Sequence, residues 1–322
     1  MRVLITGANG FLGSELVRQT VAEGMTIRAT DCHPRPKFPH VDYKPADILK
    51  PDTVAPLLEG INVVIHTAGL AHVFKKSQDA ASKFKVVNAE GTTNVAEAAA
   101  RAHVQNFILI SSVSVYGDVS YGSNENAPCR PNGPYAESKW QAEQNAVRIA
   151  SPIGMRLVIL RLATLYGEGD PGNIARLTKS IDKGRFIWIG GGKNKKSLLY
   201  IGDAARACLT TINSSIPGVH IYNVSAPAST MKDIVEKIAC ELGRRIPAYR
   251  VPGSIALGSA KIGKLILGKG GIAGILYDTL NKWLSDNFYS TDKFQHTYGF
   301  KPQISLEEGL HRELVWYKSK QG

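Results

Sequence analysis

Cysteine is scarce in this chain, and the few cysteines lie far apart. The 322 residues contain four, at positions 32, 129, 208 and 240, and no two of them form a C-x-x-C pair. The sequence therefore supports neither a disulfide framework nor a zinc knuckle. Scattered cysteines are typical of proteins from a reducing compartment, and we expect a cytoplasmic location.

Long apolar runs and metal-ligand patterns are also missing. No apolar run reaches the ~18 residues that a membrane-spanning helix needs, and only three apolar residues stand between Arg2 and Thr6. We therefore expect neither a spanning helix nor a secretory signal. None of the eight histidines stands at a metal-ligand spacing from another His, Cys or carboxylate, so we expect no metal.

Acidic residues are outnumbered by basic ones. The chain has 27 Asp and Glu against 39 Lys and Arg, which gives a net charge of +12. Such a charge favours an anionic partner, which can be a phosphate group, a membrane surface or nucleic acid. No nucleic-acid recognition motif accompanies the basic residues, so we expect no nucleic-acid partner.

Short β-branched runs alternate with helix-length segments in the first half of the chain. The runs are Val3–Ile5, Thr26–Ala29, Val63–His66, Phe107–Ser111 and Arg156–Leu160. Strands that alternate with helices predict a doubly wound, parallel α/β sheet. After about residue 165 the pattern becomes irregular and rich in glycine. We expect a nucleotide-binding domain at 1–164 plus about 194–216, and a smaller, irregular α/β substrate-binding lobe at 165–193 plus about 217–322.

A glycine-rich turn follows the first strand. Glycines at 7, 10 and 13 precede a predicted helix, whose N-terminus offers free N–H groups to a pyrophosphate. Asp31 ends the next strand, where a carboxylate accepts hydrogen bonds from ribose and repels a 2′-phosphate. We therefore expect NAD rather than NADP, with Arg28 and Arg35 as competing readers of a phosphate. The residues expected to bind the cofactor here are Gly7, Asn9, Gly10, Phe11, Leu12, Gly13 and Asp31.

A phenol and an ammonium stand four residues apart, at Tyr135 and Lys139, on one face of a predicted helix. A nearby cation favours phenolate, so we expect Lys139 to lower the pKa of Tyr135 and make it a general base and acid. Ser112 follows a buried strand at the carboxyl edge, where such sheets bind ligands. Its hydroxyl can bond the oxygen of a reacting alcohol or ketone, so we expect Ser112, Tyr135 and Lys139 to be catalytic.

These residues together resemble the extended short-chain dehydrogenase/reductases, and the resemblance covers nearly the whole chain. Further markers are Asp47–Ile48, His66–Gly69, Val87–Thr92, Arg161–Gly167, Gly299–Pro302 and Ser305–Gly309. The resemblance implies a Rossmann-type fold and an NAD(P)-dependent enzyme, in particular of the sugar-diphosphate epimerase and reductase branch. It implies cofactor contacts also for Asp47, Ile48, Ala68, Gly69, Asn88, Tyr135 and Lys139.

Departures from the family pattern narrow the function. Dehydratases of the family carry an Asp-Glu pair beside the catalytic hydroxyl, whereas this chain has Val113 and Ser114, so we do not expect dehydration. Where epimerases usually place an arginine for the substrate diphosphate, this chain has Lys196, which offers a point charge rather than a bidentate fork. The substrate contacts expected from the resemblance are Ser114, Thr164, Asn173, Arg176 and Lys196.

We interpret the chain as an NAD-dependent 4-epimerase of a nucleotide-linked hexose, of the UDP-glucose or UDP-N-acetylglucosamine type, with a transient 4-keto intermediate. The alternatives are a 4-ketoreductase of a sugar nucleotide, a 4-epimerase of a polyprenyl-diphosphate-linked sugar and, more remotely, a non-catalytic nucleotide sensor. Relatives also lead us to expect a homodimer.

One apolar and basic segment, residues 251–269, has two interpretations. The simpler is a pair of ordinary helices in the smaller lobe. The alternative is peripheral contact with the inner face of an anionic membrane, because similar segments occur in relatives that act on polyprenyl-linked sugars.

Overall fold

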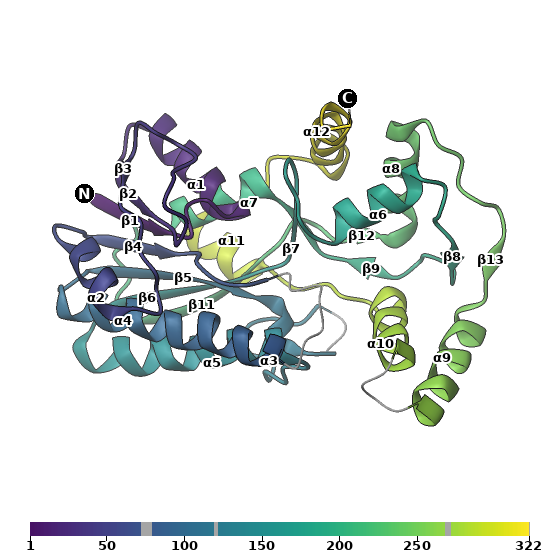
Figure 1. The fold of residues 1–322 in the computed structure, drawn as a ribbon, viewed down its shortest axis with the longest axis horizontal. Coiled ribbons are helices and arrows are strands. Elements are labelled where there is room, and N and C mark those ends of the chain that lie inside the picture. The colour runs from purple at the N-terminus through teal and green to yellow at the C-terminus, as the bar shows by residue number, and fades with distance from the viewer. Residues whose placement is uncertain (72–78, 119–121, 268–271, 322) are drawn as a thin grey trace.

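The computed structural model describes residues 1–71, 79–118, 122–267 and 272–321 (Figure 1). Its main element is a seven-stranded parallel sheet with the strand order β11-β6-β5-β4-β1-β2-β3. This order confirms the predicted doubly wound sheet. The strands are β1 (Arg2–Thr6), β2 (Thr26–Thr30), β3 (Asp42–Tyr43), β4 (Val63–His66), β5 (Asn106–Ser112), β6 (Arg156–Leu162) and β11 (Val219–Val224).

Helices cover both faces of this sheet, and strand side chains alternate between the two layers (Figure 1). Val3 and Ile5 pack with the layer of α1 and α7, whereas Leu4 packs with the layer of α4 and α5. The first layer contains α1 (Phe11–Ala22), α7 (Ile201–Thr210) and α11 (Asp292–Tyr298); the second contains α2 (Pro51–Val54), α3 (Asp79–Phe84), α4 (Gly91–Arg101) and α5 (Pro134–Ala150). Short 3₁₀ helices η1 (Ala55–Leu58), η3 (Val113–Tyr116) and η4 (Ser151–Ile153) connect these elements, and the π-helical segment η2 (Lys85–Glu90) joins α3 to α4.

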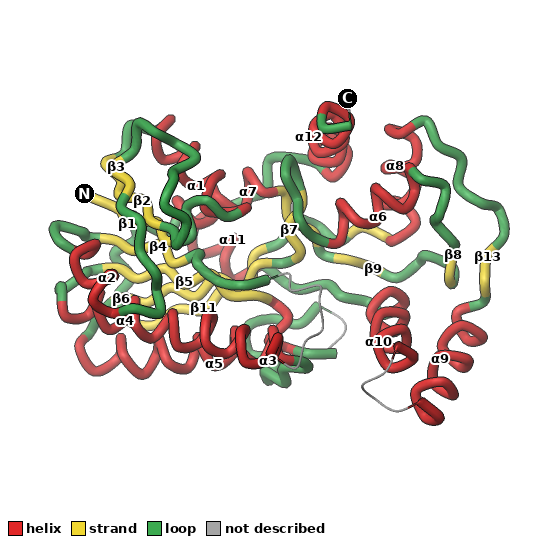
Figure 2. Tube along the Cα trace, in the orientation of Figure 1, coloured by secondary structure: helices red, strands yellow, loops and turns green. Residues whose placement is uncertain are grey.

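The remaining elements form a smaller lobe of helices and very short strands (Figure 2). Its strands pair two by two, as β7 with β10, β8 with β13, and β9 with β12. These strands are β7 (Thr164–Tyr166), β8 (Trp188–Ile189), β9 (Lys195–Lys196), β10 (Leu198–Tyr200), β12 (Ser229–Thr230) and β13 (Arg250–Val251). The helices are α6 (Asn173–Asp182), α8 (Met231–Leu242), α9 (Gly253–Leu267), α10 (Ile272–Leu284) and α12 (Leu306–Ser319).

The sheet extends further along the chain than we expected. The sequence prediction ends the segment that returns to the first domain at about residue 216, yet β11 pairs with β6 over all six of its residues. Tyr222 and Val224 on this strand are buried. A parallel neighbour with β-branched and aromatic residues completes the edge of the sheet, so the chain leaves the large sheet only after Val224.

Candidate active site

The glycine turn after β1 packs too closely for side chains. A Cβ atom on Gly7 would lie 2.7 Å from Ala68, and one on Gly13 would lie 2.0 Å from the carbonyl oxygen of Gly7. Gly10, at the start of α1, has no side chain to cap the helix, which leaves the first N–H groups of α1 for a ligand. This cradle of close backbone and an uncapped helix end fits the pyrophosphate of a dinucleotide.

Asp31 lies beside this turn. Its carboxylate accepts hydrogen bonds from the backbone N–H groups of Asn9, at 3.2 Å, and His33, at 3.1 Å. Arg28 is buried, and its guanidinium bonds Asp42 at 2.9 Å and the carbonyl of Leu57 at 2.9 Å. The guanidinium of Arg28 therefore points away from Asp31 and is not placed to bind a 2′-phosphate there.

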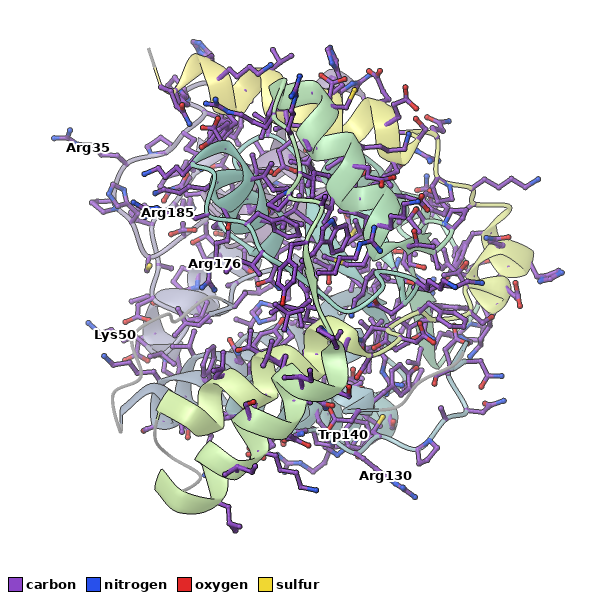
Figure 3. All side chains as sticks on the ribbon, turned by 90° about the vertical axis from the view of Figure 1, so that its right-hand side faces the viewer. Arg35, Lys50, Arg130, Trp140, Arg176 and Arg185 are labelled. Atoms are coloured by element: carbon purple, nitrogen blue, oxygen red, sulfur yellow. The ribbon has the colours of Figure 1, made fainter. Side chains whose placement is uncertain are left out.

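Arg35, the second competing residue, is exposed and extends from the edge of the molecule (Figure 3). The predicted adenine contacts Asp47 and Ile48 follow β3. Ile48 lies against the start of α4, where a Cβ atom on Gly91 would come within 2.5 Å of its side chain. The Asp47 carboxylate accepts a hydrogen bond from the N–H of Leu49 at 3.0 Å, so this turn is fixed from within.

Asn88 connects the cofactor side of the site to helix α5. Its side chain accepts a hydrogen bond from the N–H of Leu70 at 2.7 Å and donates to the carbonyl of Leu70 at 3.0 Å and to the hydroxyl of Ser138 at 2.9 Å. Gly69 must be small here, because a Cβ atom would lie 2.9 Å from Asn88 Oδ1. Asn88 thus fixes the turn after β4 relative to the helix that carries Tyr135 and Lys139.

The structure brings the three predicted catalytic residues together. Ser112 ends β5, and its hydroxyl lies close enough to the phenol of Tyr135, in the first turn of α5, to act on the pKa of that phenol. The ring of Phe84 packs edge-on against Tyr135 with 5.7 Å between ring centroids. One turn further along α5, the buried ammonium of Lys139 donates to the carbonyl of Ile110 at 2.5 Å.

Our expectation about the electrostatics of this pair is wrong. Burial raises the pKa of Tyr135, and the hydrogen bond with Ser112 opposes that rise. Burial lowers the pKa of Lys139 to about 8, against the opposing charge of Glu143. Because the ammonium is directed at a strand carbonyl, it does not lower the pKa of the phenol, whose protonation is set by desolvation.

The predicted substrate residues lie in several places. The N–H of Ser114 donates to Ser112 Oγ at 3.1 Å, and its own buried hydroxyl has no partner among the described residues. Thr164 is exposed at the start of β7, and Asn173 and Arg176 are exposed on the first turns of α6. Figure 3 shows Arg35, Lys50, Arg176 and Arg185 toward one side of the molecule.

Lys196 does not extend into open space. Its ammonium donates to the carbonyls of Lys282 at 2.6 Å and Ser285 at 2.7 Å, at the C-terminal end of α10. Burial lowers its pKa to about 8, and Asp286 opposes this shift. In this structure Lys196 therefore caps a helix, which is a different task from the predicted contact with a diphosphate.

A buried polar network, which was not expected from the sequence, lies behind the predicted catalytic residues. Glu143 and Arg161 form an ion pair at 2.6 Å with side chains 0% and 2% exposed. Ser111 donates to Glu143 at 2.5 Å, and Arg161 donates to the hydroxyl of Tyr116 at 2.9 Å. Glu143 stands four residues after Lys139 on the same face of α5, and a carboxylate at that spacing was the available signal.

His66 has a structural role. It is buried, with Nδ1 2.8 Å from the hydroxyl of Thr6 and Nε2 3.1 Å from that of Thr92. Burial lowers its pKa to about 3, so the ring is neutral and joins β1 to α4.

Comparison with known proteins extends these observations. The chain is 28% identical to an N-acetyl-alpha-D-glucosaminyl-diphospho-ditrans,octacis-undecaprenol 4-epimerase of Escherichia coli O157:H7, over 98% of this chain and 94% of the relative. It is also 28% identical to a UDP-glucose 4-epimerase of Vibrio cholerae, over 96% and 93%. The structure superimposes on MoeE5 in complex with UDP-glucuronic acid and NAD with a TM-score of 0.80 and 25% identity, over 99% and 100% of the two chains.

A family model for the NAD dependent epimerase/dehydratase family matches residues 3–225, which include the glycine turn, Asp31 and the catalytic trio. This match and the complexes of structural neighbours with NAD confirm the predicted cofactor class. The protein therefore belongs to the NAD dependent epimerase/dehydratase family.

Proposed function

We propose that this protein is an NAD-dependent epimerase that inverts C4 of a hexose linked to a diphosphate carrier. The observation that carries the proposal is that Ser112 lies beside the phenol of Tyr135 at the carboxyl edge of the sheet, one helical turn from Lys139. Relatives that are named 4-epimerases cover nearly the whole chain and support the same reaction.

Tyr135 acts as the acid and base on the sugar 4-hydroxyl. NAD supplies the acceptor, and later the donor, of the C4 hydride. Ser112 shares the hydrogen bond to the sugar oxygen and, by bonding the phenol, favours the ionised form that proton abstraction needs. Burial raises the pKa of Tyr135, so its phenolate is a strong base toward the 4-hydroxyl, and the phenol formed by that abstraction is the acid that protonates the oxygen when the keto group is reduced.

Other residues of the chain hold the reactants. Asp31 accepts hydrogen bonds from the adenosine ribose, and the N–H groups at the start of α1 receive the pyrophosphate. Lys139 bonds the nicotinamide ribose, which requires its ammonium to leave the carbonyl of Ile110. The unpartnered hydroxyl of Ser114, one turn of chain from Ser112, contacts the sugar.

The carrier that we expect first is UDP, and Arg176 on α6 is the cation that we assign to its diphosphate. A polyprenyl diphosphate is the second candidate. It is favoured by the relative from Escherichia coli O157:H7 and by Lys196, which caps α10 instead of offering a phosphate contact. We further propose a homodimer through the faces of α4 and α5, the helix pair on the outside of the sheet (Figure 1).

The test is to incubate the purified protein with UDP-glucose or UDP-N-acetylglucosamine and to analyse the products by NMR. We expect the C4 epimer to form to equilibrium without added reductant. Tyr135→Phe is the matched inactive control. Conversion only of a 4-keto sugar, and only with added reduced cofactor, would replace the epimerase by a one-way ketoreductase. Failure of UDP alone to bind in calorimetry would exclude UDP as the carrier. Sedimentation tests the homodimer, for which we expect the mass of two chains.

A further inference from the structure

Helices α9 and α10 form a hairpin that stands apart from the sheet. The two helices pack against each other and extend away from the body of the smaller lobe (Figures 1 and 2). The base of the hairpin is fixed, because Trp283 Nε1 donates to the carbonyl of Ile189 at 3.1 Å and Asn194 donates to the carbonyl of Trp283 at 2.8 Å. The other end carries the connection between the helices, which lies outside the described residues.

Exposed apolar side chains are concentrated on this hairpin. Among the described residues, 11 large apolar side chains are exposed, and five of them lie between Tyr249 and Leu276 while the others are scattered. Single exposed apolar residues are normal on a protein surface, but a cluster indicates a binding surface. Four of the five lie on the hairpin, namely Ile255 (61% exposed), Ile262 (61%), Leu265 (86%) and Leu276 (49%), and Tyr249 (75%) precedes it.

Three of these side chains share one face of α9. Ile255, Ile262 and Leu265 are separated by seven and then three residues, spacings that return to the same side of a helix. Ala260, which is 5% exposed, lies on the opposite side and marks the buried face of α9. Lys261 is exposed and flanks the apolar face. The helix thus has one face buried at Ala260 and an exposed apolar face on the other side.

The charge of this region identifies the partner. From Gly253 to Leu284, the span of the hairpin, the sequence has four Lys residues and one acid, Asp278. A second copy of the chain would place these like charges opposite one another, which is unfavourable. An anionic lipid surface offers both an apolar layer for the aliphatic side chains and negative headgroups for the cations. No described helix is long and apolar enough to cross a membrane, so the contact is with the surface.

We propose that the α9–α10 hairpin docks the protein on an anionic membrane surface through Ile255, Ile262 and Leu265, with Lys261 among the headgroups. The hairpin is connected to the active site by a short segment. Tyr289 lies five residues after the end of α10, and its ring stacks on that of Tyr116 with 5.7 Å between ring centroids. Tyr116 ends the short helical segment Val113–Tyr116, which directly follows Ser112. The docked hairpin is thereby linked to the turn that follows Ser112.

The experiment is flotation of the full-length protein with vesicles of phosphatidylcholine, either pure or with about 30% phosphatidylglycerol. We expect binding to the anionic vesicles at about 0.05 M salt and a clear loss at about 0.5 M salt. The double variant Ile262→Gln, Leu265→Gln should lose at least about tenfold in partition coefficient. Lys261→Gln should lose less, and Val315→Gln, which removes an exposed apolar residue of α12 (54% exposed), should bind as the unmodified protein does.

Two outcomes overturn the proposal. One is absence of binding of the unmodified protein to anionic vesicles at low salt; the other is equal binding by the double variant. If the double variant instead has a lower sedimentation coefficient than the unmodified protein, the hairpin is a contact between two copies of the chain. Flotation is independent of turnover, and epimerase activity on a UDP-sugar in the absence of lipid is measured separately. A failure of docking is thereby distinguished from a failure of the proposed reaction.

Discussion

The carboxylate of Glu143 and the guanidinium of Arg161 form a fully buried ion pair, and the same carboxylate accepts the hydroxyl proton of Ser111, the residue next to Ser112. Glu143 lies two helical turns after Tyr135 on α5, whereas Arg161 lies on β6. The pair therefore fixes the helix that carries Tyr135 to the strands that carry Ser112. Tyr116 continues the connection, with its hydroxyl donating to Asn223 on β11 at 2.7 Å.

Removing the charge of Glu143 should destabilise the protein strongly. Glu143→Gln leaves the Arg161 guanidinium buried without its counter-charge, and breaking such a pair lowers the free energy of unfolding by about 3–5 kcal/mol. Glu137→Gln is the matched control, because Glu137 is exposed on the same helix, and it should change stability by less than about 0.5 kcal/mol. Urea denaturation measures both values. Equal stabilities of the two variants would show that the buried pair does not hold the helix in place.

Tyr135→Phe should remove the acid and base while preserving the ring contact with Phe84. General acid and base catalysis contributes roughly 10²–10⁴-fold, and we expect turnover to fall by that factor with NAD affinity and melting temperature nearly unchanged. Steady-state kinetics and a thermal melt check the two parts. Turnover close to that of the unmodified enzyme would exclude Tyr135 as the essential base.

Asp31 should determine the choice of cofactor. Asp31→Asn removes the charge that repels a 2′-phosphate. Because the N–H groups of Asn9 and His33 bond different oxygens of the carboxylate, the amide oxygen of the variant keeps one of these two hydrogen bonds. Titration should show tighter binding of NAD than of NADP by the unmodified protein and a smaller ratio in the variant. Tighter NADP binding by the unmodified protein would assign the phosphate to the exposed Arg35 instead.

Glu313 should make stability depend on pH. It is 2% exposed on α12, accepts the N–H of Gly167 at 3.0 Å, and has its pKa raised from 4.5 to about 8, first by burial and then by Asp170. The fold thus favours the protonated carboxyl, and its contribution to stability is full below about pH 4.5 and is lost as the pH rises through about 8.

Glu313→Gln keeps an acceptor for Gly167 but cannot ionise. Its melting temperature relative to that of the unmodified protein should therefore rise by several degrees between about pH 5 and about pH 9. Glu307→Gln, at an exposed position of the same helix, serves as the control. A constant difference between Glu313→Gln and the unmodified protein over this range would mean that Glu313 does not titrate there.

The nucleotide end and the catalytic trio could be predicted because local sequence patterns determine where these residues lie. The glycines at 7, 10 and 13 and the acid at 31 are placed by a strand, a turn and the next strand, so little else in the chain affects them. Ser112 and Tyr135 meet because parallel strands end at one edge of a sheet and the following helix packs back on it.

Contacts between segments that are distant in the sequence could not be predicted from such local patterns. Lys196 caps α10 through a carbonyl 86 residues away, and nothing near position 196 in the sequence indicates this partner. The raised pKa of Tyr135 depends on burial under neighbours such as Phe84, whereas the spacing from Lys139 suggested the opposite shift. The partner of Arg161 likewise lies on another element, 18 residues away.

The central claim is that one enzyme-bound cofactor removes and returns the same hydride at C4. It is tested most directly with a UDP-hexose that carries deuterium at C4, incubated with the purified enzyme in ordinary water without added cofactor and followed by NMR. The account predicts a C4 epimer that retains the deuterium at C4. Loss of the label to solvent, or a product that forms only in proportion to added reduced cofactor, would contradict it.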